Sequence, residues 1–195
     1  LHIISSSPDE NEAESMLRSD EDKIRKLLGR LVFSTGRVSL AESVAQKLLS
    51  SGKTVAAAES CTGGLISSML TDVPGSSGYF RRGWVTYSNE SKQEELGVDK
   101  DIIESFGAVS EQTAAAMSRG AKVKSGTDYA IAVTGIAGPG GGTNEKPVGL
   151  VYISVTSDDR IETERCVFPG SRSSVRLRSA LTALNMLRLI DCEVV

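Results

Sequence analysis

From residue 39 onward, apolar and polar positions follow the periods of helices and strands. Ser39 and Glu42 form a capping box ahead of an apolar stripe that starts at Leu40, which predicts a helix that stops at Gly52. The nearly all-apolar run 54–58 predicts a strand that is covered on both faces. The sequence therefore opens this region with a helix followed by a buried strand.

Later segments repeat the two patterns and end in a hairpin. They predict helices at 65–70, 89–96, 100–106 and 110–126, and strands at 84–87 and 128–133. Residues 148–156 and 161–168 alternate around the turn 157–159, which indicates an antiparallel hairpin, and 171–191 predicts a last amphipathic helix. Strands that alternate with helices, plus one hairpin, predict an α/β sandwich with a mixed sheet.

The first 37 residues form a separate small piece. Residues 1–6 and 31–33 are predicted strands on either side of a polar helix at 9–28, which Gly29 ends. A β-α-β piece of this size cannot bury its own sheet face, and the chain opens with Leu1 rather than Met. We therefore expect residues 1–37 to be the remnant of an upstream region or a linker, and residues 38–195 to form the main domain.

Composition excludes several classes of protein. The 195 residues carry 22 Lys plus Arg and 25 Asp plus Glu, with no basic block, so nucleic acid is not the expected partner. Apolar stretches such as 149–155 are far shorter than the ~18–20 residues of a membrane span, so no membrane partner is expected. The odd, widely spaced cysteines Cys61, Cys166 and Cys192 favour a reducing compartment, hence a cytoplasmic protein.

The only histidine is His2, at the edge of the chain. This placement excludes a Ser-His-Asp triad, and one His with three scattered Cys offers no zinc-ligand spacing. We therefore expect neither a metal nor a cofactor. Any enzymatic chemistry must be carried by Ser, Lys, Tyr, Asp or Glu.

The segment AESCTGG (58–64) places Ser60 in the turn between a buried strand and the start of a helix. Helix N–H groups stabilise developing negative charge, and the glycines Gly63 and Gly64 let a substrate approach the backbone. Ser60 is therefore a candidate nucleophile. The alternative is that Ser60 or Thr62 simply caps the helix.

A serine nucleophile needs a base, and without histidine the candidates are Lys and Tyr. The segment YSNESK (87–92) leaves the next strand at the carboxyl end of the sheet, where open α/β sheets build their sites. Burial would make Lys92 a base near neutral pH, with Tyr87 to relay or orient the proton. In the alternative interpretation, Lys92 is one solvated charge beside Glu90.

The loop 134–147 is rich in glycine, but TGIAGPGGG does not form the G-x-G-x-x-G pattern of a dinucleotide site. We expect Thr134, Gly135, Ala137 and Gly138 to wrap an anionic or carbonyl group with backbone N–H groups and one hydroxyl. A flexible lid is the alternative.

Two arginines, Arg172 and Arg176, lie at the start of the last helix, where the positive end of the helix dipole favours acidic side chains. A phosphate ligand and simple solvation explain them equally well. Among the aromatic residues Tyr79, Phe80 and Trp84, one is a candidate to face a cationic ring, with core packing as the alternative.

Cys61 is the competing nucleophile, because a thiolate at a helix start has a lowered pKa. A small buried cysteine beneath the helix start is the alternative.

Five motifs in this order resemble the C-terminal domain of the CinA family, which includes stand-alone, PncC-type nicotinamide-nucleotide amidases: AESCTGG (58–64), PGSSGYF (74–80), VTYSNESK (85–92), GAVSEQTA (107–114) and TGIAGP (134–139). The resemblance covers about residues 39–191, and residues 1–37 resemble the end of the preceding region of full-length members. It implies a three-layer α/β/α sandwich.

The resemblance also implies an activity, which is hydrolysis of nicotinamide mononucleotide to nicotinate mononucleotide and ammonia in pyridine nucleotide salvage. By motif, the nucleophile falls on Ser60 and its helpers on Lys92 and Tyr87. Substrate contacts then fall on the turn 61–64, on Phe80, on the loop residues Thr134, Gly135, Ala137 and Gly138, and on Arg172 and Arg176. Family members are commonly homo-oligomers. The alternative is a catalytically weak nucleotide-binding or partner-binding module of a competence-associated protein.

Overall fold

The computed structural model describes residues 1–190 and divides into two compact units, with the boundary between Val38 and Ser39. The expected end of the last helix at Asp191, and Cys192, lie outside the described residues. Within residues 1–190, no helix combines the length and apolar character needed to cross a bilayer.

Unit 1 contains one long helix, α1 (Glu10–Leu28), and a short 3-10 turn, η1 (Gly29–Leu31). The Asp9 carboxylate caps α1 by accepting from the Asn11 N–H, and Gly29 ends it, as expected. The prediction of strands at 1–6 and 31–33 is wrong, because neither segment is paired in a sheet. Strand patterning alone does not make a sheet where no partner strand supplies the hydrogen bonds.

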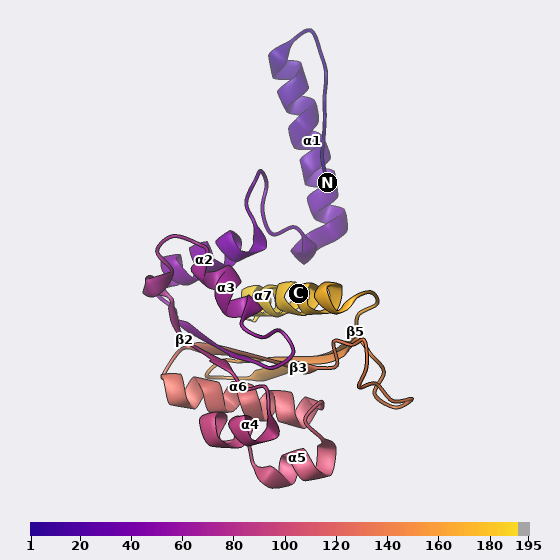
Figure 1. The fold of residues 1–195 in the computed structure, drawn as a ribbon. Helices are drawn as coiled ribbons and strands as arrows, with labels where there is room; N and C mark the ends of the chain where they lie inside the picture. Colours follow the sequence, from indigo (N-terminus) through magenta and orange to yellow (C-terminus); the bar gives the residue numbers. More distant parts are fainter. Residues whose placement is uncertain (191–195) are drawn as a thin grey trace. The chain divides into compact units, whose positions relative to one another are not determined.

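Unit 2 is a three-layer α/β/α sandwich around a five-stranded mixed sheet of order β2-β1-β3-β4-β5, which confirms the predicted fold class (Figure 1). Strands β2, β1 and β3 are parallel, and β4 and β5 form the expected antiparallel hairpin. The strands are β1 (Val55–Glu59), β2 (Phe80–Val85), β3 (Tyr129–Gly135), β4 (Leu150–Thr156) and β5 (Ile161–Val167).

Helices cover both faces of this sheet (Figure 1). One face carries α4 (Asn89–Leu96), α5 (Lys100–Phe106) and α6 (Glu111–Ser125), and the other carries α2 (Leu40–Ser51), α3 (Leu65–Thr71) and α7 (Arg172–Leu189). A 3-10 turn, η2 (Ser76–Gly78), precedes β2. All the helices expected from the periodicity of residues 39–190 are present, and β2 starts four residues earlier than predicted.

The two faces of the sheet differ in side-chain size. Toward α2, α3 and α7 the strands present branched residues such as Ile131 and Ile153, whereas toward α6 they present the alanines Ala58, Ala130 and Ala132. Small side chains let α6 lie close to the sheet. A Cβ added at Gly120 of α6 would lie 1.9 Å from the Leu96 carbonyl oxygen, so α4 also packs tightly against α6.

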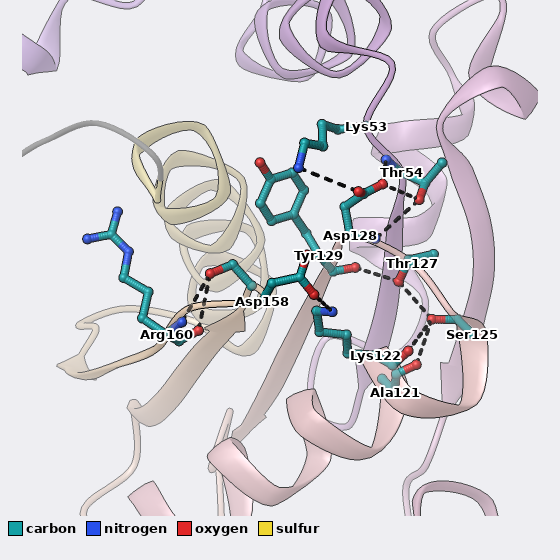
Figure 2. A network of polar contacts seen from close by, with 11 residues as sticks. Lys53, Thr54, Ala121, Lys122, Ser125, Thr127, Asp128, Tyr129, Asp158 and Arg160 are labelled. Atoms are coloured by element: carbon teal, nitrogen blue, oxygen red, sulfur yellow. Dashed lines mark hydrogen bonds and ion pairs between the residues drawn. The ribbon is translucent and has the colours of Figure 1, made fainter.

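The amino ends of β1 and β3 are joined by Asp128 (Figure 2). Its carboxylate accepts from the Thr54 N–H and Thr54 hydroxyl, both at 2.8 Å, and lies 3.5 Å from the Lys53 ammonium. Burial is the largest influence and raises the pKa of Asp128, but the bonds from Thr54 and the charge of Lys53 together lower it below its ordinary 3.8. The charged carboxylate is therefore the form that holds these two strand ends.

We expect Asp128→Asn to lower the free energy of unfolding by about 1–2 kcal/mol at neutral pH, because the amide cannot accept all of these bonds. A lowered folded-state pKa gives stability that is present above the unfolded value and lost as pH falls through the folded one. The difference from wild type should therefore shrink in urea titrations repeated at pH values progressively below the ordinary aspartate value of 3.8. Asp158→Asn, which removes the exposed bond to Lys122, is the matched control and should change stability much less.

Candidate active site

Ser60 follows the central strand β1 at the carboxyl edge of the parallel part of the sheet. Its N–H donates to the Val133 carbonyl at 2.9 Å, and the Thr86 N–H donates to the Glu59 carbonyl at 2.9 Å, so the ladder continues one residue past each strand. This register sets Thr86, Ser60 and Thr134 in one row across three strands. Because side chains alternate between faces, the row shares the face of Ala58 and Ala132, toward α4 and α6.

Glu59, the preceding residue, points to the opposite face and caps α3. Its carboxylate is fully buried and accepts from the Ile66 N–H at 3.0 Å and from the Ser67 N–H and hydroxyl, both at 2.8 Å. The alternative that Ser60 or Thr62 caps this helix is therefore wrong. The N–H groups of Ile66 and Ser67 are also taken, which corrects the expectation that the helix start is open to a substrate.

The turn 60–64 between β1 and α3 requires its two glycines. Gly63 and Gly64 have φ values of 57° and 91°, a left-handed conformation that costs other residues free energy. The Gly63 N–H donates to the Ser60 carbonyl at 3.1 Å, which closes the turn. The backbone thus bends sharply at the point where Ser60 is presented.

Lys92 reaches Ser60 from the first turn of α4. Its ammonium nitrogen lies 3.2 Å from the Ser60 hydroxyl oxygen, 2.8 Å from the Thr86 carbonyl and 3.3 Å from the Ser88 carbonyl. Ser88 caps α4 in a reciprocal box with Ser91, and this fixes the direction in which Lys92 leaves the helix. The side chain is 1% exposed, so the alternative of a solvated surface charge is wrong.

Burial lowers the pKa of Lys92 from its ordinary value, and the nearby Cys61 and Glu90 groups offset part of this effect. A neutral amine has two N–H donors and one lone pair. The two carbonyl oxygens of Thr86 and Ser88 accept from both donors, which leaves the lone pair for the Ser60 hydroxyl. This arrangement suits proton transfer from Ser60 to Lys92.

Tyr87 lies at the rim of the site rather than beside the base. Its side chain is 59% exposed, and its hydroxyl accepts from the Arg172 guanidinium at 2.8 Å. Within residues 1–190, no hydrogen bond joins Tyr87 to Lys92 or Ser60. The structure therefore does not bring the phenol to Lys92, where the proton-relay hypothesis would need it.

The two arginines of α7 both reach the site, one helical turn apart. Arg172 also donates to the Gly138 carbonyl at 3.0 Å, and Arg176 donates to the Thr62 carbonyl at 2.7 Å. The start of α7 thereby contacts the turn after β1, the loop after β3 and Tyr87 after β2. These contacts give the rim a cationic side, which the alternative of two merely solvated arginines does not explain.

The glycine-rich loop, residues 136–149, lies two residues further along the chain than expected, because β3 continues through Gly135 and β4 begins only at Leu150. The Ile136 N–H donates to the Leu150 carbonyl and the Gly149 N–H to the Ile136 carbonyl, which closes the base of the loop. A Cβ on Gly135 would lie 2.8 Å from the Leu150 carbonyl oxygen, so this position needs glycine. Ala137 and Gly138 follow directly and are both buried.

Thr134, the last of the row of three, is buried, and its hydroxyl donates to the Ala108 carbonyl at 2.7 Å. The Thr134 hydroxyl therefore has no donor left for a substrate, and it can only accept a hydrogen bond from another group. In contrast, the Thr62 and Thr86 hydroxyls are buried without a hydrogen-bond partner among the described residues.

Phe80 is a predicted substrate residue that the structure does not bring to Ser60. It is the first residue of β2 and pairs with Val55, at the other end of the strands. Tyr79 is buried and donates to the Leu70 carbonyl, while Trp84 lies under the Arg82 guanidinium at 5.3 Å. Of these aromatic residues, only Trp84 thus faces a cation, and that cation belongs to the chain.

Cys61 is 4% exposed, and burial raises its pKa to about 11, although Arg172 and Arg176 lower it in part. The hypothesis of a low-pKa thiolate is therefore wrong, and the buried-thiol alternative holds. Among residues 1–190, no group of three or more His, Cys, Asp or Glu side chains is placed to hold a metal ion.

Two features of the site were missed from the sequence. The first is Glu59 as the buried cap of α3. Its position at the end of the otherwise apolar strand VAAAE is a sequence signal, because a buried carboxylate needs hydrogen-bond donors. No sequence signal marks the second feature, which is that the connection between α5 and α6 reaches Thr134.

Comparison with known proteins places these observations in a family. A model described as the CinA C-terminal domain matches residues 37–190. A putative competence-damage inducible protein of Clostridium beijerinckii is 45% identical over 97% of this chain and 46% of its own length. A CinA-like protein of Syntrophotalea carbinolica is 48% identical over 91% of this chain and 43% of its own length. The chain thus spans about half the length of the curated relatives it matches.

Solved structures agree with this assignment. The competence/damage inducible protein CihA of Agrobacterium tumefaciens is 42% identical, with a TM-score of 0.73 over 79% of this chain and 97% of its own. The competence damage-inducible protein A of Klebsiella pneumoniae is 34% identical, with a TM-score of 0.76 over the same shares. Fold, motifs and sequence identity agree, and the chain belongs to the CinA family.

Proposed function

We propose that this chain hydrolyses the carboxamide of nicotinamide mononucleotide to the carboxylate, with release of ammonia. The observation that carries the proposal is the buried Lys92 amine at 3.2 Å from the Ser60 hydroxyl. The substrate class follows from the resemblance of the site motifs to the nicotinamide-nucleotide amidases of the family. The chemistry follows from the pair itself, because a hydroxyl beside a neutral amine is an activated nucleophile.

In the first half of the reaction, neutral Lys92 takes the Ser60 proton as the hydroxyl oxygen attacks the carboxamide carbon. In this proposal the oxyanion is held by a backbone N–H group of the turn 61–64 other than that of Gly63, which already bonds Ser60, or by one of residues 137–138, and a strong donor is worth about 3–4 kcal/mol. The Lys92 ammonium then returns its proton to the departing nitrogen, which leaves as ammonia. An acyl ester on Ser60 remains.

In the second half, water attacks the ester carbon and gives its proton to Lys92. The ester bond breaks, Ser60 recovers a proton from Lys92, and the carboxylic acid that forms gives its proton to solvent and leaves as the carboxylate. The Thr86 and Ser88 carbonyls hold the Lys92 nitrogen in place in both halves. One side chain therefore serves as base and as acid, without a histidine.

Arg172 and Arg176 are the proposed phosphate ligands, because both guanidinium groups lie at the cationic rim beside the start of α7. Arginine binds phosphate through two parallel N–H bonds. In this proposal Tyr87 acts on the substrate indirectly, through its 2.8 Å bond to Arg172, and orients the guanidinium. This replaces the proton-relay role with a positioning role.

Ser60→Ala and Lys92→Met should each lower kcat/KM for ammonia release from nicotinamide mononucleotide by about 10³-fold or more. The assay is run with a chelator present, and Lys100→Met, at an exposed lysine, is the control that should keep wild-type activity. A wild type that binds the nucleotide without turnover would refute the amidase proposal. The nucleotide-binding module of a competence-associated protein would then take its place.

The pH–rate profile should rise as Lys92 loses its proton, with a midpoint below the ordinary lysine value of 10.5, because burial lowers the pKa of Lys92. Glu90 is a neighbouring charge that raises this pKa, so Glu90→Gln should move the rising limb to lower pH. Glu94→Gln, on the same helix, should leave it in place. An unchanged midpoint in Glu90→Gln would show that the limb reports another group.

Cys61→Ala should retain activity within about threefold, because a thiol whose pKa is about 11 is protonated at neutral pH. Iodoacetamide should label Cys61 slowly in the folded protein, as followed by peptide mass mapping. Fast labelling with parallel loss of activity, together with an active Ser60→Ala variant, would identify a cysteine hydrolase instead.

A further inference from the structure

The connection between α5 and α6 presents four consecutive carbonyl groups, and all four accept hydrogen bonds. The Gly107 carbonyl accepts from the Ser110 and Thr113 hydroxyls at 2.9 and 2.8 Å. The Ala108 carbonyl accepts from Thr134, beside Ser60 in the row at the sheet edge. The other two carbonyls, of Phe106 and Val109, accept from a residue that is distant in sequence.

That residue is Lys146, in the glycine-rich loop 136–149. Its ammonium nitrogen lies 2.7 Å from the Phe106 carbonyl oxygen and 2.9 Å from that of Val109. Phe106 is the last residue of α5, and the carbonyl end of a helix favours a cation. Lys146 thus fastens the loop to the same connection that holds Thr134.

Gly107 lies beside this contact. Its φ is 83°, and a Cβ built at this position would lie 2.9 Å from the Lys146 nitrogen. The Lys146 N–H also bonds the Thr143 hydroxyl at 3.0 Å, while the Thr143 N–H donates to the Lys146 carbonyl at 2.8 Å. These two bonds close a turn over residues 143–146 of the loop.

The loop has a second attachment near its start, where Arg172 donates to the Gly138 carbonyl at 3.0 Å. Arg172 belongs to α7 and the carbonyls of Phe106 and Val109 belong to the α5–α6 connection, so the two attachments come from opposite faces of the sheet. The loop follows the carboxyl end of β3, and Ser60 follows the carboxyl end of the neighbouring strand β1. Losing either attachment frees one side of the loop.

We propose that Lys146 is a positioning residue, which holds the glycine-rich loop in the arrangement that binds the nucleotide. It acts through its bonds to the Phe106 and Val109 carbonyls and does not touch the reacting atoms. Its effect on substrate rests on the proposed amidase function, whereas its effect on the loop does not.

Two measurements test the proposal with Lys146→Met, Lys146→Arg and the control Lys100→Met. In the free protein, hydrogen exchange of amides 137–148 should be about tenfold faster in Lys146→Met than in the control. In turnover, Lys146→Met should raise KM for nicotinamide mononucleotide about tenfold and leave kcat within about threefold. Lys146→Arg should recover much of both, because a guanidinium also donates to two carbonyls.

Gly107→Ala is a second disruption, since its Cβ would displace the Lys146 nitrogen and its positive φ would strain the α5–α6 connection, and it should reproduce the loop exchange of Lys146→Met. Unchanged loop exchange in both variants would overturn the proposal, as would a fall in kcat at constant KM. If the wild type neither binds nor hydrolyses the nucleotide, the proposed function fails, and the exchange result alone decides whether Lys146 holds the loop.

Discussion

A lysine nitrogen buried at the carboxyl end of the three parallel strands is the constraint on which the rest of the site depends. Burying an unpaired ammonium is costly, so the group must be neutral or must meet acceptors. Lys92 donates to the Thr86 and Ser88 carbonyls. Both belong to the short connection 86–88 between the end of β2 at Val85 and the start of α4 at Asn89. The alanines of the sheet let α6 lie close, and α4 packs tightly against α6 at Gly120, on the side from which Lys92 reaches Ser60.

At the end of β1, Glu59 caps helix α3 and the next residue, Ser60, contacts Lys92. Because successive side chains point to opposite faces, Glu59 meets α3 while Ser60 meets α4. The Glu59 carboxylate satisfies the first N–H groups of α3, a task that a serine or threonine usually performs. Ser60 is thereby left free for Lys92, and the glycines of the turn let the chain reverse within four residues.

Much of this architecture could be predicted from the sequence, because capping residues, glycine stops and period-two alternation are local signals. Strand register is not local, and it places Phe80 opposite Val55, away from Ser60. The same limit applies to Tyr87, whose bond to Arg172 depends on where α7 returns to the sheet. The strands expected at 1–6 and 31–33 failed for a related reason, since alternation cannot supply a partner strand.

The residues of the candidate site all belong to unit 2. Residues 39–195 make up 157 of 195 positions, about 81% of the chain, and the solved relatives from Agrobacterium and Klebsiella each match 79% of it with nearly their whole length. The family model begins at residue 37, next to the same boundary. The hydrogen bonds given above for Ser60, Lys92, Arg172 and Lys146 all join residues of unit 2, so the contacts that carry the proposed chemistry lie in the part of the chain that these solved relatives match.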